Sequence, residues 1–298
     1  MVPLMWRLAA LVLLAACGCT ARALAPPDVR DGGIGVDLAL ARPFDLASPP
    51  VNPCPAGTSF IYTIETDAAL SRFSPGSGQF FDVGTISCPS AGGATPNSMA
   101  VDREGNGWVN FSDGSLFRLI TATDVCTATT YAPGQGGLQS FGMSFAEDAP
   151  GSTAETLFIA DQNPGAPLPL LASVDLGSFT LSSEVSLVAD SGPELTGDDQ
   201  ANLWGFFPSS TPPRVARIDK QLGTLDRTLL LPTLAGSPRA WGVAAYQGDF
   251  YIFLQRDIDP STVVYRLDGA TGAVTTVADG TGRRIVGVGV ATCAGNGG

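Results

Sequence analysis

The feature that most constrains the fold is a repeat of about 45 residues that runs through most of the 298-residue chain. Each copy begins with a strand-like segment of alternating apolar residues, which has a small residue near its start. Self-similarity at such a period is typical of architectures in which each copy is one structural unit. The small residues are spaced 44, 55, 45 and 45 positions apart, at Ser98, Gly142, Gly197, Gly242 and Gly287.

Three more strand-like elements complete each copy. A turn leads into an aromatic segment such as Gly107-Trp108-Val109, and an apolar-x-Arg-apolar segment follows it. A small-residue turn then precedes a last alternating segment, such as residues 273–277. Four short strands in every 40–50 residues predict an all-β chain folded as a β-propeller. A two-sheet β-sandwich with fortuitous spacing is the alternative, and three parallel repeat elements argue against it.

The count of strands predicts five four-stranded blades within residues 53–298. The last alternating segment, Ile285–Val290, has no chain after it to complete a blade. The first copy, which begins at Phe60, lacks its first strand. We therefore expect the C-terminal strand to pair with the Phe60 strand and close the ring, which removes exposed strand edges. The recurrent small residue lets neighbouring first strands approach closely around a narrow channel.

The segment Met99–Val109 resembles NHL-type and related bacterial surface propellers. Such propellers carry many functions, so the resemblance implies a fold more than an activity. One position within the repeat carries an arginine in four copies, and we expect these side chains to brace the blades rather than bind a substrate. They are Arg72, Arg118, Arg217 and Arg266.

The N-terminus has the pattern of an export signal. Arg7 precedes nine apolar residues, too few to span a bilayer as a helix. The run ends in Leu14-Ala15-Ala16-Cys17, which resembles the lipobox of bacterial lipoproteins. That resemblance implies a signal peptide over 1–16, a lipid on Cys17 and a place in the cell envelope, at the outer membrane. An ordinary secretory signal is the alternative. Residues 17–52 are rich in proline and predict an extended tether.

Composition excludes several classes of function. The chain has no histidine, which removes His-dependent triads and His-ligated metal sites. Its formal net charge is -12, which disfavours nucleic acid as a partner. We expect no cofactor and no metal. The acidic residues Asp102, Asp198, Asp199 and Asp249 fall where tight turns are predicted, and turn formation is the favoured interpretation.

Six cysteines fit an exported protein. Cys54 enters the second strand of the first blade and Cys293 leaves its first strand, so a disulfide between them is expected to lock the ring. Cys88 and Cys126 then remain for each other. Their strand positions suggest opposite faces of the propeller, which leaves that second disulfide open.

The loops that enter the first strands predict a ligand site at one mouth of the channel. Its candidate residues are Asn97, Gln139, Glu194, Arg239, Trp241 and Arg284. Polar and aromatic groups that converge at a concave surface are typical of ligand sites, whereas a solvated rim with internal ion pairs is the alternative. Two arginines against one glutamate favour an anionic ligand. No catalytic residue is identified.

The leading hypothesis is a lipid-anchored binding scaffold for an envelope protein or a glycan. This hypothesis rests on a fold that is a good scaffold and on a sequence in which no catalytic constellation is recognised. The alternative is a propeller-type lactonase or hydrolase with a divalent cation at the mouth. Glu194 and Asn97 are the mouth residues that suit such a cation, whereas Arg239 and Arg284 would repel it.

Overall fold

The computed structural model describes residues 54–55, 58–163 and 168–295. These residues belong to one unit of the chain, 47–298. The predicted signal peptide over 1–16, the lipidation site Cys17 and the predicted tether over 17–52 lie outside the described residues.

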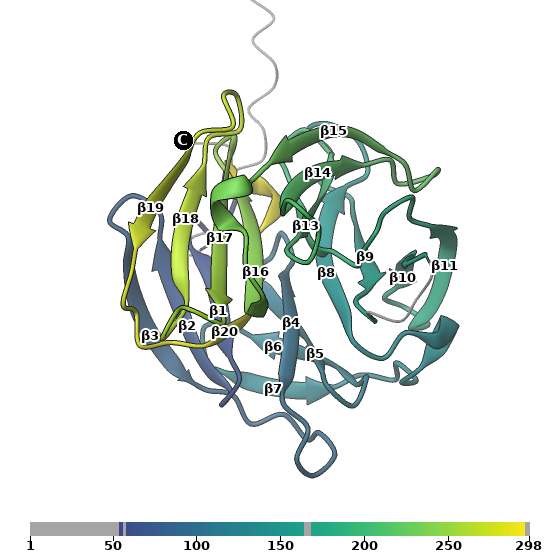
Figure 1. The fold of residues 1–298 in the computed structure, drawn as a ribbon. Helices are drawn as coiled ribbons and strands as arrows, with labels where there is room; N and C mark the ends of the chain where they lie inside the picture. The colour runs from purple at the N-terminus through teal and green to yellow at the C-terminus, as the bar shows by residue number, and fades with distance from the viewer. Residues whose placement is uncertain (1–53, 56–57, 164–167, 296–298) are drawn as a thin grey trace, which may run out of the picture. The chain divides into compact units, whose positions relative to one another are not determined.

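Twenty strands form five four-stranded antiparallel sheets, arranged in a ring as the blades of a propeller (Figure 1). Blade 1 contains β20 (Ile285–Gly289), β1 (Ile61–Glu65), β2 (Ala69–Ser74) and β3 (Gln79–Thr85). Blade 2 contains β4 (Pro96–Val101), β5 (Asn106–Phe111), β6 (Leu116–Ile120) and β7 (Val125–Ala128). Blade 3 contains β8 (Phe141–Glu147), β9 (Glu155–Asp161), β10 (Leu170–Asp175) and β11 (Thr180–Ser186). Blade 4 contains β12 (Glu194–Gly197), β13 (Leu203–Phe207), β14 (Arg214–Ile218) and β15 (Leu225–Leu230). Blade 5 contains β16 (Pro238–Tyr246), β17 (Asp249–Arg256), β18 (Val263–Leu267) and β19 (Val274–Ala278).

The C-terminal strand closes the ring as predicted. Strand β20 pairs antiparallel with β1, with Thr63 opposite Val288. The five inner strands β4, β8, β12, β16 and β20 contact one another in a closed cycle around the channel. Apolar side chains fill the spaces between neighbouring blades, which places the core between the sheets rather than within one sheet.

Close approach of the inner strands explains the small residue of the repeat. A Cβ added at Gly142 on β8 would lie 2.3 Å from the carbonyl oxygen of Pro193 and 2.8 Å from Cα of Glu194. No side chain fits at such a distance. Neighbouring inner strands therefore need glycine or another small residue at this point of the repeat.

Local turn chemistry connects the strands within a blade. Gln247 and Gly248 join β16 to β17 with φ angles of 52° and 83°, and two consecutive positive φ angles are typical of the tight turns that join hairpin strands. Asp102 accepts hydrogen bonds from the backbone N–H of Asn106, at 2.7 Å, and from Nε1 of Trp108, at 3.1 Å. Asp198 is hydrogen-bonded to Trp204 in the same way in blade 4. These aspartates are thus turn-forming residues, as expected.

The structure contains two disulfides, one at the ring closure in blade 1 and one between blades 1 and 2. Cys54 is bonded to Cys293, with a Cα–Cα distance of 5.5 Å, as predicted from ring closure. Cys88 is bonded to Cys126, with a Cα–Cα distance of 5.0 Å, which settles the pairing that the sequence left open. Cys88 follows the outer strand of blade 1 and Cys126 lies on the outer strand of blade 2, so this bond joins adjacent blades at the outside of the ring. Disulfides are typical of exported proteins.

Helical structure among the described residues is limited to three short 3-10 segments: η1 (Gln135–Gly137), η2 (Pro232–Leu234) and η3 (Thr292–Gly295). No helix in this part of the chain has the length and apolar character needed to cross a membrane. Segment η3 follows β20 and contacts both β8 and β16, so it lies at the channel end where the inner strands finish. The opposite end, where they begin, is the predicted mouth.

Candidate functional site

A cavity of about 550 Å³ lies at the mouth of the channel. We call it the mouth cavity, and its lining comes from the starts of inner strands and from the loops beside them in blades 2 and 3. Trp241 on β16 faces these groups from blade 5. The residues that line the cavity are Asn97, Ser112, Gly137, Gln139, Ser140, Gln162, Asn163 and Trp241. Three of the six residues predicted for the mouth, Asn97, Gln139 and Trp241, are therefore brought together.

Glu194 lies beneath this cavity rather than on its rim. It is the first residue of β12 and is fully buried. Its carboxyl accepts hydrogen bonds from Oγ of Ser98, on the non-adjacent blade 2, and from Nε2 of Gln162, at 2.8 Å. Burial raises the pKa of Glu194 to about 8, while the hydrogen bonds from Ser98, Gln162 and the backbone of Met143 act in the opposite direction.

A chain of side-chain amides connects the buried carboxyl to the cavity. Nε2 of Gln162 faces Glu194 and the carbonyl of Pro193, which turns Oε1 of Gln162 toward Asn97. Nδ2 of Asn97 in turn donates to Oε1 of Gln162, at 3.3 Å, and to Oδ1 of the buried Asn110, at 3.2 Å. The donors of these amides are thus used within the protein. Oδ1 of Asn97 remains to accept hydrogen bonds from a ligand, and Oε1 of Gln162, which already accepts one from Asn97, has a second lone pair for a further bond.

A β-bulge turns Asn97 into the cavity. Pro96 pairs with Phe111 and Ser98 with Asn110, so Asn97 is the extra residue that has no partner across the sheet. Bulges re-aim a side chain relative to the regular alternation of a strand. The bulge therefore frees Asn97 to reach the neighbouring blade, where its Nδ2 also donates to the carbonyl of Phe141, at 3.3 Å.

Trp241 is the aromatic group of the mouth. It is partly exposed and packs against the core between blades 4 and 5. Trp108 and Trp204 are 6% and 3% exposed, and each donates its indole N–H to a turn aspartate. Among the tryptophans that the structure describes, Trp241 is thus the one that lines the mouth cavity.

The two arginines of the predicted site do not line the mouth cavity. Arg239 is exposed and is the unpaired residue of a second bulge, between Pro238 and Ala240. Arg284 is also exposed and directly precedes β20. None of the described residues that line the cavity carries a positive charge. The basis for the expected anionic ligand is therefore missing from the cavity itself.

Sequence reasoning assigned no role to Gln162, Ser112 or Asn110. The available signal was the position of Gln162 immediately after an aromatic strand, which brings it to the same end of the ring as Asn97. Its bond to Glu194 depends on the depth of the glutamate, and strand order does not show that depth. Within the described ranges, no group of three or more Cys, Asp or Glu side chains is placed to hold a metal ion.

Similarity of this chain to known proteins is limited to solved structures. No protein-family model matches it, and no curated protein matches it. Solved structures with a similar fold include a protein of unknown function from Bacteroides thetaiotaomicron, at 16% identity and a TM-score of 0.46, where the match covers 74% of this chain and 56% of that one. A protein of unknown function from Bacteroides caccae has 11% identity and a TM-score of 0.41, with 74% and 73% covered. The hydrazine synthase of Kuenenia stuttgartiensis has 12% identity and a TM-score of 0.40, with 72% and 64% covered.

Proposed function

We propose that this protein is an exported, lipid-anchored binding protein of the cell envelope, and that its mouth cavity binds a sugar ring of a glycan. The observation that carries the proposal is the pairing of the Trp241 ring with the carbonyl oxygens of Asn97 and Gln162 in one cavity. The envelope location and the lipid rest on the Leu14–Cys17 lipobox, and the two disulfides support export.

The chemistry of the cavity suits a neutral, hydroxyl-rich ligand. A sugar ring has an apolar face that stacks on an aromatic side chain, while its hydroxyl groups donate hydrogen bonds sideways. Asn97 and Gln162 supply acceptors for those hydroxyls, because their own N–H groups are directed into the protein. The lack of a cation among the described residues that line it makes the cavity a poor match for an anion.

Glycan binding is tested with a glycan array followed by titration of tryptophan fluorescence. Because Trp108 and Trp204 are buried, ligand-dependent quenching reports mainly on Trp241. Trp241→Ala is expected to weaken binding by at least about tenfold, which corresponds to about 1.4 kcal/mol. Phe81→Ala is a matched control, since Phe81 is an aromatic residue on β3 that is 43% exposed and outside the mouth cavity.

Two results would overturn the proposal. One is the absence of any neutral glycan that binds the wild-type protein. The other is a Trp241→Ala variant that binds the selected glycan as tightly as wild type and Phe81→Ala do. Asn97→Ala tests the acceptor side of the cavity independently, and it is expected to weaken binding of the same glycan while leaving the stacking partner in place.

A further inference from the structure

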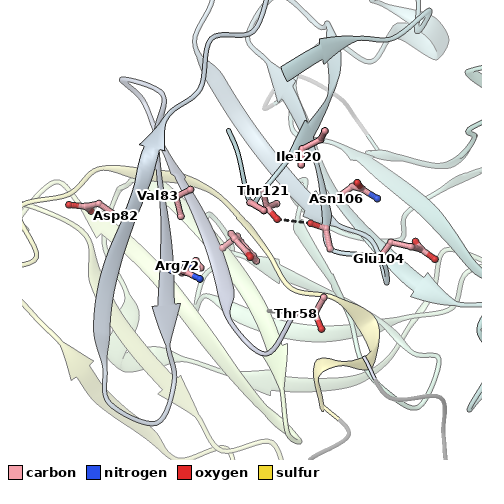
Figure 2. Close-up of a pocket in the computed structure, with 11 residues that line it drawn as sticks. Thr58, Arg72, Asp82, Val83, Glu104, Asn106, Ile120 and Thr121 are labelled. Atoms are coloured by element: carbon pink, nitrogen blue, oxygen red, sulfur yellow. Dashed lines mark hydrogen bonds between the residues drawn. The ribbon is translucent and has the colours of Figure 1, made fainter. Parts of the chain in front are cut away.

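A second cavity, of about 520 Å³, lies between blades 1 and 2 (Figure 2). It shares no lining residue with the mouth cavity. Its walls come from β1, β2 and β3 of blade 1, where Asp82 is a lining residue on β3, and from the turns after β4 and β6 of blade 2. The residues that carry the inference are Thr58, Arg72, Glu104, Asn106, Ile120 and Thr121.

Arg72 differs from two of its counterparts in the repeat. Arg217 is paired with Asp226 at 2.7 Å, and Arg266 is paired with Asp249 at 2.6 Å. Each of these ion pairs joins two neighbouring strands of one blade, so these two arginines brace the strands within their own blades. On β3, the residue opposite Arg72 is Phe81, which has no charge to offer. Arg72 consequently has no carboxylate partner among the described residues.

The guanidinium of Arg72 is held in place but left with open donors. Its Cζ lies 5.0 Å from the centre of the Phe60 ring, which fixes the plane of the group by a cation–π contact. Its Nε atom is buried and has no hydrogen-bond partner. Protein atoms enclose Nε, so a ligand in the cavity meets the guanidinium through its terminal nitrogens Nη1 and Nη2.

The side-chain hydrogen-bond donors of Thr58, Thr121 and Asn106 already have partners within the protein. Thr58 donates its hydroxyl to the carbonyl of Pro55, and Thr121 donates to the carbonyl of Gly105, each at 2.7 Å. Figure 2 shows the hydrogen bond of Thr121 on the blade 2 side of the cavity, with Arg72 on the blade 1 side. The amide nitrogen of Asn106 is engaged by a turn aspartate. A ligand that enters the cavity therefore meets the Arg72 guanidinium as its principal hydrogen-bond donor.

We propose that this cavity binds a carboxylate group through Arg72, as carried by an acidic sugar or by the C-terminus of a peptide. A carboxylate matches the planar donor fork of arginine, and the terminal nitrogens Nη1 and Nη2 can bind its two oxygens together. Ile120, which is 45% exposed, supplies an apolar wall for the organic part of the ligand. The exposed carboxylate of Glu104 disfavours ligands with more than one negative charge, whereas the second lining carboxylate, Asp82, is ion-paired with Arg283.

The test uses the purified full chain and ligand-observed NMR with four probes. D-glucuronate and D-glucose differ in the carboxylate, and N-acetyl-alanyl-alanine differs from its C-terminal amide in the same way. We expect the carboxylate probes to bind and their neutral partners not to bind. A preference for glucuronate assigns an acidic sugar as the ligand class, whereas a preference for the dipeptide assigns a peptide C-terminus.

Arg72→Gln is expected to weaken carboxylate binding by at least about tenfold. Arg118→Gln is the matched control, because Arg118 occupies the same repeat position in blade 2, is exposed and does not line the cavity. Glu104→Gln leaves the guanidinium untouched and is expected to tighten binding two- to threefold by removing a like charge. Should Arg72→Gln fail to fold, Glu104→Gln and wild type still decide the question.

The proposal is overturned if no carboxylate probe shows binding to wild type at a probe concentration of about 50 mM. A site with millimolar affinity would be nearly saturated at that concentration. It is also overturned if folded Arg72→Gln binds as well as Arg118→Gln, or if Glu104→Gln leaves the affinity unchanged. Trp241→Ala is expected to have no effect on these probes, so failure of this site and failure of glycan binding at the mouth are separate results.

Discussion

Replacement of Glu194 by glutamine is expected to remove most of one pH-dependent component of stability. Glu194 is fully buried, and burial raises its pKa from 4.5 to about 8. The folded protein therefore binds this proton more tightly than the unfolded chain does. Stability from this group is fully present below pH 4.5 and is lost as the pH rises through the folded-state pKa.

The magnitude follows from the width of that interval. Each pH unit between the two pKa values lowers the free energy of unfolding by about 1.4 kcal/mol. Between pH 5 and pH 8 the wild-type protein is thus expected to lose on the order of 4 kcal/mol through Glu194. Glutamine retains a carbonyl acceptor at this position and has no proton to release, so Glu194→Gln is expected to lack this loss.

Urea unfolding at pH 5 and at pH 8 measures the effect. Burial also raises the pKa of Glu155, to about 7, so wild type has a second group that titrates in the same range. Glu155 is present in both proteins, and the difference between wild type and Glu194→Gln cancels its contribution. Glu184→Gln, at an exposed carboxylate, is the control. An equal change in the free energy of unfolding between pH 5 and pH 8 in wild type and Glu194→Gln would refute the reasoning. The pKa of Glu194 would then be the same in the folded and the unfolded chain.

Three further changes test the ring and its anchor. Gly142→Ala places a Cβ 2.3 Å from a backbone oxygen and is expected to lower the free energy of unfolding in urea by about 1–3 kcal/mol. Gly92→Ala is the control and is expected to be near neutral, because no atom lies within 4 Å of its added Cβ. Equal effects of the two substitutions would contradict the close approach of the inner strands. Cys293→Ser opens a link across 239 residues and is expected to lower the free energy of unfolding by about 4–5 kcal/mol on the chain-entropy account, and an unchanged urea midpoint would contradict it. Cys17→Ser is expected to abolish incorporation of labelled palmitate and the need for detergent during extraction, and undiminished labelling would rule out this anchor.

The ring itself was predictable because its determinants are local. Alternation of apolar residues marks strands, glycine and aspartate mark turns, and both signals are carried by residues a few positions apart. Repetition of those signals then gives the number of blades. The incomplete first and last copies predicted the β1–β20 pairing, since an unpaired strand and a missing strand satisfy each other's backbone hydrogen bonds. The Cys54–Cys293 bond followed from the same closure.

The mouth shows what only the tertiary structure decided. Strand order places Asn97, Glu194 and Arg239 at one end of the ring, but it does not show how deep each lies or where its side chain points. Bulges at Asn97 and Arg239 interrupt the alternation of their strands, and one side chain enters the cavity while the other stays in solvent. Glu194 is buried because Gly142 lets β12 come close to β8. Such outcomes depend on packing between blades, which involves residues far apart in the chain and leaves no periodic signal in the sequence.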